Sequence, residues 1–266
     1  YMTDEFGQTW KREYLIYVPK NSKDLWPNGA PVVIAFAGNT QPDHVFFDCT
    51  HWWEVADKYG FIVVVPCSTG TVVCGWNRGA ASKTQPDDIK FVETLIEEIN
   101  EKYNTDPKRI YATGQSLGCM FIQLLAMKIP EKFAAIGGTS GPIMGQNSIP
   151  SDASNDILPV YLVFGEYDYW PWKVGQLQEG DFLGTMGASQ AGYSLFTQEY
   201  WISRNVLGSI DNYEITHQNN LPKNKDNSIM YIVKPNSQEY PGDRYKTFTW
   251  FNKNGIPLFV WTQSAG

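Results

Sequence analysis

The sequence contains no long hydrophobic run and no excess of positive charge. Its longest apolar runs, residues 32–37 and 61–66, have the length of strands and fall far short of the about 20 residues that a membrane span requires. There are 21 Lys and Arg against 28 Asp and Glu, which gives a formal net charge of −7, and no basic stripe is present to neutralise phosphates. We therefore expect neither a membrane nor a nucleic acid as a partner.

The sequence is also poor in patterns that bind metals. Its four cysteines form no CxxC pair and it has only three histidines, so a zinc finger has little support. Cys67 and Cys74 lie seven residues apart across a Gly-containing loop, a spacing that allows a local disulfide. Cys119, in contrast, is expected to be a small buried hydrophobic residue. We expect no metal and no organic cofactor.

Hydrophobic and aromatic residues, in contrast, are plentiful. The chain has 266 residues, of which 42% are hydrophobic and 15% aromatic, enough for a large core and for some rings that meet a ligand. No internal repeat or low-complexity linker divides it. We therefore predict a single domain over residues 1–266.

Strand and helix patterns alternate along the first two thirds of the chain, which favours an α/β fold with a mostly parallel central sheet and helices on both faces. The pattern loosens over 175–227 around one helix near 198–206, and this segment is expected to be a cap or insertion. Strands are predicted at 13–18, 31–37, 61–65, 109–113, 134–138, 160–164, 230–233, 245–251 and 258–262, and helices at 52–58, 87–103 and 116–128.

The motif with the clearest chemistry is the GxSxG pentapeptide at 114–118. A predicted strand precedes it and a predicted helix follows it, which is the strand–turn–helix setting of a nucleophile elbow. The turn is so tight that side chains at Gly114 and Gly118 would collide with their neighbours, and the nucleophile needs a positive φ. Ser116 is therefore the candidate nucleophile, and a serine that merely caps a helix is the alternative.

Two further segments follow predicted strands. The loop at 37–41 is placed to supply one backbone N–H of an oxyanion hole, from Asn39 or Thr40, with Leu117 supplying the other; an ordinary surface turn is the alternative. Asp168 lies where a carboxylate would orient a catalytic imidazole. Glu166 competes for that role, and either acid could simply be solvated.

With these residues in view, the chain resembles the α/β-hydrolase esterases of the polyhydroxybutyrate depolymerase and feruloyl esterase type. The resemblance runs from about residue 13 to 168 through blocks at 14–19, 37–41, 76–77, 87–89, 106–111, 133–135 and 140–141. It implies a serine esterase with Ser116 as nucleophile, Asp168 as triad acid and an oxyanion hole near Asn39 and Leu117. The chain departs from the family pattern at two places. It has Ala37-Gly38 where the family usually has His-Gly, and Gly118-Cys119 where the family has Gly-Gly.

The base of the triad is the least determined residue. Chain order in this fold places the histidine after the acid, which His44 and His51 do not satisfy. His51 is expected to be structural, and His44 is a candidate for contact with substrate near the oxyanion loop. In the resembling family the base follows a strand like 258–262, so we expect it beyond Gly266, with His217 as the alternative and a non-catalytic carbohydrate-binding module as the remaining case.

The function predicted from the sequence is two-step acyl transfer through Ser116. Trp76, Trp170 and Trp172 are candidate substrate contacts, suited to an aromatic acyl group or a sugar ring, and core packing is the alternative. The expected substrates are feruloyl or acetyl esters of plant polysaccharide, followed by polyesters of the polyhydroxybutyrate type or short-chain esters. The chain begins at Tyr1 without a leader, so we expect a secreted protein whose signal peptide was removed, or a sequence that starts inside a longer one.

Overall fold

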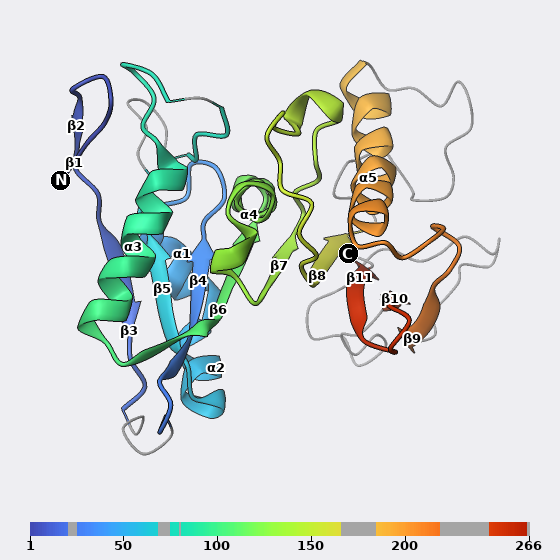
Figure 1. Cartoon of the computed structure of the whole chain (residues 1–266), viewed down its shortest axis with the longest axis horizontal. Helices are drawn as coiled ribbons and strands as arrows, with labels where there is room; N and C mark the ends of the chain where they lie inside the picture. The colour runs from blue at the N-terminus through green and yellow to red at the C-terminus, as the bar shows by residue number, and fades with distance from the viewer. Residues whose placement is uncertain (21–25, 69–74, 80, 166–184, 219–244, 265–266) are drawn as a thin grey trace. The chain divides into compact units, whose positions relative to one another are not determined.

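The computed structural model describes residues 1–20, 26–68, 75–79, 81–165, 185–218 and 245–264 (Figure 1). The chain forms two compact units. The first unit consists of Tyr1–Gly141 and Ile149–Leu158, and the second unit of Pro142–Ser148 and Pro159–Gly266. The single domain and the cap at 175–227 stay predictions.

The first unit is built on a mostly parallel sheet with strand order β3-β5-β4-β6-β7. Ile34 pairs with Val64 on one side and with Ala112 on the other, so the middle strands are paired along both edges. Only β3 runs antiparallel to its neighbour. The bounds are Tyr14–Tyr17 for β3, Ala30–Phe36 for β4, Ile62–Pro66 for β5, Thr105–Gln115 for β6 and Ala135–Thr139 for β7, while Met2–Thr3 (β1) and Thr9–Trp10 (β2) form a separate hairpin.

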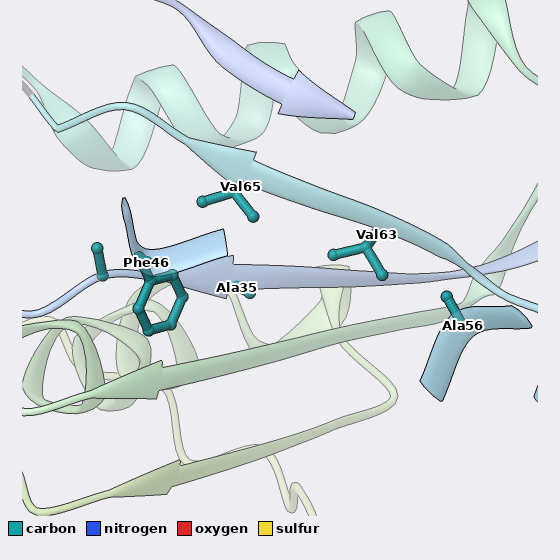
Figure 2. Packing of buried hydrophobic residues seen from close by; sticks show 6 residues of the cluster. Ala35, Phe46, Ala56, Val63 and Val65 are labelled. Carbon is teal, nitrogen blue, oxygen red and sulfur yellow. The ribbon is translucent and has the colours of Figure 1, made fainter. Parts of the chain in front are cut away.

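Helices cover both faces of this sheet because the residues of its buried strands alternate between two cores. Ala35, Val63 and Val65 point to the face that Phe46 of α1 and Ala56 of α2 cover (Figure 2). The neighbouring Phe36 points to the other face, where its ring meets Phe121 of α4 at 5.5 Å between centroids. The helices are α1 (Asp43–Thr50), α2 (Trp52–Tyr59), α3 (Asp88–Lys102) and α4 (Leu117–Lys128), with a 3₁₀ turn at Pro130–Lys132; a second 3₁₀ turn, Gln146–Ser148, belongs to the second unit.

Two helix ends are fixed by local chemistry in the sequence. Gly60 ends α2 with a φ of 71° and donates its N–H to the Ala56 carbonyl at 2.8 Å, the left-handed cap that glycine favours. Asp87 caps α3 by accepting the Lys90 N–H at 2.9 Å. Both helices therefore begin or end where local chemistry in the sequence indicates.

The second unit carries a smaller mixed sheet with strand order β8-β11-β10-β9, in which β8 and β11 are parallel and the other pairs antiparallel. A tight turn joins β10 and β11, in which Asn252 donates its N–H to the Ile256 carbonyl at 2.9 Å. The bounds are Val160–Gly165 for β8, Thr185–Arg204 for α5, Glu214–Gln218 for β9, Tyr245–Phe251 for β10 and Pro257–Ser264 for β11.

The predicted α/β class and mostly parallel sheet are confirmed, with differences in detail. Helix α5 begins thirteen residues before the predicted helix at 198–206, and helix α1 and strand β9 were not predicted. The predicted strand at 230–233 lies outside the described residues. None of the helices in the described part of the chain is both long enough and apolar enough to span a membrane.

Candidate active site

Ser116 lies at a sharp turn between β6 and α4. Its φ of 53° and ψ of −117° are close to the first central position of a type II′ turn, where glycine dominates. The Ser116 N–H donates to the Thr139 carbonyl at 2.8 Å, and the Ser116 carbonyl accepts from the Met120 N–H at 3.0 Å. The side chain is exposed. This backbone holds the serine in a strained conformation with its side chain accessible, as the elbow prediction requires.

Glycines make this turn sterically feasible. A Cβ on Gly114 would lie 2.5 Å from the carbonyl carbon of Gly118, and a Cβ on Gly118 would lie 2.1 Å from the Phe36 oxygen and 2.6 Å from the Ala37 oxygen. Contacts this short do not occur for real side chains. Side chains at these two positions would therefore collide with their neighbours, as predicted. Because both residues are glycine, the end of β4 can lie against the first turn of α4.

Cys119 is buried, as predicted, and its surroundings explain how the chain accommodates it where the resembling family has glycine. A Cβ on Gly138 would lie 2.7 Å from the Cys119 sulfur, and a Cβ on Gly141 would lie 2.7 Å from the Cys119 Cβ. The Cys119 thiol donates to the Gly141 carbonyl at 3.2 Å, and the Gln123 amide donates to the same oxygen at 2.6 Å. Cys119 therefore fills space that two nearby glycines leave open.

The predicted oxyanion loop at 37–41 approaches the nucleophile through Gly38. A Cβ on Gly38 would lie 3.5 Å from the Cβ of Ser116, whereas Asn39 and Thr40 are exposed and Thr40 has a φ of 59°. Leu117 is half-buried as the first residue of α4. The structure thus brings this loop, Ser116 and Leu117 together, while the assignment of Asn39 or Thr40 and Leu117 as oxyanion donors stays a prediction.

Trp76 lies in the core of the first unit, only 4% exposed. Its ring stacks on Phe121 of α4 at 5.0 Å between centroids with planes 8° apart, and meets Phe36 edge-on at 5.1 Å. The indole N–H donates to the Ala37 carbonyl at 3.0 Å. Trp76 therefore contacts the start of the oxyanion loop, and its contact with a substrate stays a prediction.

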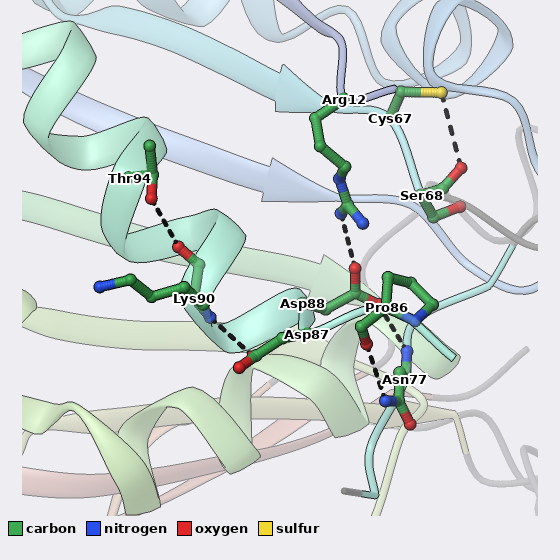
Figure 3. A network of polar contacts seen from close by, with 9 residues as sticks. All are labelled: Arg12, Cys67, Ser68, Asn77, Pro86, Asp87, Asp88, Lys90 and Thr94. Atoms are coloured by element: carbon green, nitrogen blue, oxygen red, sulfur yellow. Dashed lines mark hydrogen bonds and ion pairs between the residues drawn. The ribbon is translucent and has the colours of Figure 1, made fainter. Parts of the chain in front are cut away.

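A buried ion pair supports the segment that carries Trp76, and the sequence reasoning did not find it. The Arg12 guanidinium lies 2.6 Å from one carboxylate oxygen of Asp88, whose other oxygen accepts the Asn77 N–H at 2.6 Å (Figure 3). Burial raises the pKa of Asp88, and the Arg12 charge opposes that rise. The signal in the sequence was a pair of adjacent aspartates at a helix start, of which the cap uses only Asp87.

The three histidines lie in different settings. His44, in α1, lies 3.5 Å from the Asp43 carboxylate, and His51 stacks on Trp53 with centroids 4.7 Å apart; both side chains are exposed. His51 also separates α1 from α2, which agrees with the structural role predicted for it.

His217 is part of strand β9 in the second unit, and its ring lies 3.2 Å from the hydroxyl of Thr216. It faces a groove of about 680 Å³, and the described residues that line this groove include no carboxylate. A catalytic imidazole needs a carboxylate to orient it. The role of His217 as base stays a prediction.

The remaining candidates lie outside the described residues: Asp168, Glu166, Trp170, Trp172 and Cys74, the cysteine whose spacing allows a disulfide with Cys67. Their predicted roles stay predictions. Within the described part of the chain, no group of three or more His, Cys, Asp and Glu side chains is arranged to hold a metal ion.

The family model described as esterase PHB depolymerase matches residues 13–158, which include β3 to β7, the loop at 37–41 and Ser116. The chain belongs to this esterase family. The match covers the residues on which the elbow and the Trp76 contact depend, and of the buried ion pair it covers Asp88. Membership therefore agrees with the resemblance inferred from the sequence blocks.

Relatives of known activity add detail to the family assignment. Over 157 residues the chain is 32% identical to a bifunctional acetylxylan esterase/xylanase of Neocallimastix patriciarum, a match that covers 59% of this chain and 21% of that protein. It is 26% identical over 200 residues to acetylxylan esterase A of Talaromyces purpureogenus, covering 70% and 50%. The chain thus spans half or less of the length of these curated relatives.

A solved structure supports the fold of this family member. The acetyl xylan esterase from Aspergillus awamori superposes with a TM-score of 0.57 over 95% of this chain and 87% of that chain, at 15% sequence identity. At this identity the likeness concerns the fold alone. It confirms the predicted α/β-hydrolase fold.

Proposed function

We propose that this family member is a serine carboxylic-ester hydrolase that deacetylates plant polysaccharide, xylan in particular, through an acyl-enzyme. The observation that carries the proposal is the strained, exposed Ser116 with the loop at 37–41 packed against it through Gly38. Strain held at an exposed nucleophile is typical of a catalytic site, and it serves no purpose in a helix cap. The names of two relatives and of one solved structure support acetylxylan as substrate.

The chemistry proceeds in two steps. The Ser116 oxygen attacks the carbonyl carbon of the ester while a histidine takes the hydroxyl proton, and backbone N–H groups from the loop at 37–41 and from Leu117 stabilise the oxyanion. The bond to the sugar oxygen then breaks, and that oxygen receives the proton from the histidine. Water repeats the sequence on the acyl-enzyme, which releases acetate and restores Ser116. Asp168 orients the imidazole, and the base is His217 or a histidine beyond Gly266.

This proposal includes the place where the protein works. Xylan is a polymer that cannot cross a membrane, so an enzyme that deacetylates it acts outside the cell, which favours secretion. Feruloyl esters, which the sequence predicts together with acetyl esters, are a further substrate class for the same site, with Trp170 and Trp172 as contacts for the aromatic acyl group. A polyester is the alternative that the family description supports.

The test compares acetylated xylan, methyl ferulate and polyhydroxybutyrate as substrates for the protein and for Ser116→Ala. We expect acetate release from xylan, a loss of at least about a thousand-fold in Ser116→Ala, and covalent labelling of Ser116 by a serine-reactive phosphonate, located by peptide mass. His217→Ala in parallel decides whether His217 is the base. A protein that binds xylan but, even when extended beyond Gly266, takes no label and releases no acetate contradicts the proposal and supports the binding-module alternative.

A further inference from the structure

The Trp76 indole and the oxyanion loop are joined by one buried hydrogen bond. The donor, Nε1 of Trp76, and the acceptor, the Ala37 carbonyl, are 3.0 Å apart and 39 residues apart in the chain. Both residues are at most 4% exposed, so water does not compete for this bond. The ring itself is held between Phe36 and Phe121, which leaves the indole N–H little freedom to turn away.

This bond fixes the first peptide of the loop. The Ala37 carbonyl oxygen accepts the Trp76 indole N–H, and a Cβ on Gly118 would come within 2.6 Å of the same oxygen. A peptide unit is planar and trans, so the direction of the Ala37 carbonyl also sets the direction of the Gly38 N–H. Gly38 is the loop residue that packs against Ser116. The orientation of the loop at the nucleophile therefore depends on where the Ala37 oxygen is held.

The buried ion pair anchors the residue that follows Trp76 in the chain. Asn77, the next residue, donates its backbone N–H to Asp88 at 2.6 Å and its side-chain amide to the Pro86 carbonyl at 2.8 Å (Figure 3). Asp88 is in turn held by Arg12, whose guanidinium lies 3.8 Å above the Phe91 ring. The side chains of Arg12 and Asp88 are 4% and 0% exposed, so the pair acts as a rigid support in the interior.

We propose that Trp76 is a positioning residue of the esterase. Through its hydrogen bond to Ala37, Trp76 holds the oxyanion loop at 37–41 in place beside Ser116. Trp76 does not touch the reacting atoms, and it acts through the Ala37–Gly38 peptide. The inference rests on the proposed function for its effect on turnover. Its effect on the loop does not depend on that function and is measured separately.

The chain offers a matched control for this role. Trp26, which is half-buried where Trp76 is buried, makes the same kind of bond in the same unit, from its Nε1 to the Gly60 carbonyl at 2.8 Å, at the C-terminal end of α2. Trp26→Phe and Trp76→Phe each remove one indole-to-carbonyl hydrogen bond and keep an aromatic ring. A merely structural role predicts the same consequences for both variants, whereas a positioning role predicts different ones.

The experiment measures amide hydrogen exchange in a peptide covering residues 37–41 and steady-state hydrolysis of an aryl acetate, for the parent and both variants. For Trp76→Phe we expect exchange about five-fold faster, the factor for one lost hydrogen bond, and kcat about ten-fold lower with KM within about two-fold, because loss of an oxyanion contact acts on the transition state. Trp26→Phe should change neither quantity. Parent-like exchange and kcat in Trp76→Phe, or equal changes in both variants, overturn the inference.

Two further outcomes are also decisive. A parent that hydrolyses no ester, even when the chain is extended beyond Gly266, refutes the proposed function, and the exchange comparison still supports or overturns the positioning of the loop. Should Trp76→Phe fail to fold, exchange of the Trp76 indole N–H in the parent takes its place. Slow exchange supports the buried bond to Ala37, and a rate as fast as that of an exposed indole overturns it.

Discussion

Two residues of the first unit have a positive φ at the start of a helix without being glycine. Ser116 precedes α4 with a φ of 53°, and His51 precedes α2 with a φ of 52°. Their ψ angles differ, however: 31° at His51 is ordinary left-handed backbone, whereas −117° at Ser116 lies in a region that glycine dominates. A positive φ alone therefore does not mark a functional residue.

The surroundings of the two residues separate them further. His51 ends α1 and starts α2 at the surface, where its side chain stacks on Trp53 and lies 3.1 Å from the Glu54 carboxylate. The backbone next to Ser116 is closely packed: a Cβ on Gly118 would lie 2.1 Å from the Phe36 oxygen, and a Cβ on Gly141 would lie 2.3 Å from the Ser116 oxygen. Strain at Ser116 is imposed by packing, while His51 occupies a conformation that the local chain tolerates.

The largest effect is expected from Gly118→Ala, which would break the elbow. Its new Cβ would lie 2.1 Å from the Phe36 oxygen and 2.6 Å from the Ala37 oxygen, both backbone atoms, so β4 and α4 must separate. We expect a loss of about 3 kcal/mol or more in the free energy of unfolding, measured by urea denaturation. Gly79→Ala is the control, because its nearest neighbour is a side-chain oxygen at 3.7 Å, and it should be close to neutral. Equal stability of the two variants would refute the account of the elbow.

The next effect is expected from Ser116→Gly, which keeps the turn and removes the strain. A non-glycine residue in a disfavoured region costs about 1–3 kcal/mol, and glycine loses about 0.5–1 kcal/mol more backbone entropy on folding. We expect a net gain of about 1 kcal/mol in stability together with the loss of esterase activity, a trade typical of active sites. Thermal unfolding beside Ser116→Ala separates the two contributions, because alanine removes the hydroxyl and keeps the strain. A glycine variant no more stable than the alanine variant would contradict strain at Ser116.

The elbow was predictable because its steric requirements concern residues that are close together in the sequence. Gly114, Ser116 and Gly118 are placed by backbone sterics within one turn, and the strand before and the helix after them have clear periodicity. The buried strands β4 and β5 were equally predictable, as continuous apolar runs. Each of these features depends on local sequence alone.

Features that depend on distant contacts were not predictable in the same way. Trp76 could be assigned to the core or to a substrate site, since nothing near it in the sequence indicates that its indole reaches Ala37. The pairing of Asp88 with Arg12 likewise joins residues 76 positions apart. Helix α1 escaped prediction because its start at Pro42 has no side-chain cap and its end is His51 rather than glycine.

The smallest effect is expected from His51→Gly, and it sharpens the comparison with Ser116→Gly. Left-handed backbone costs a non-glycine residue about 1–2 kcal/mol, histidine being among the residues found there more often. Glycine relieves that cost but adds unfolded-state entropy and removes the contacts with Trp53 and Glu54, so the terms nearly cancel. We expect stability within about 0.5 kcal/mol of the parent and unchanged esterase activity. A gain as large as that of Ser116→Gly would mean that the positive φ itself, and not the closely packed backbone at Gly118 and Gly141, is the source of strain in both turns.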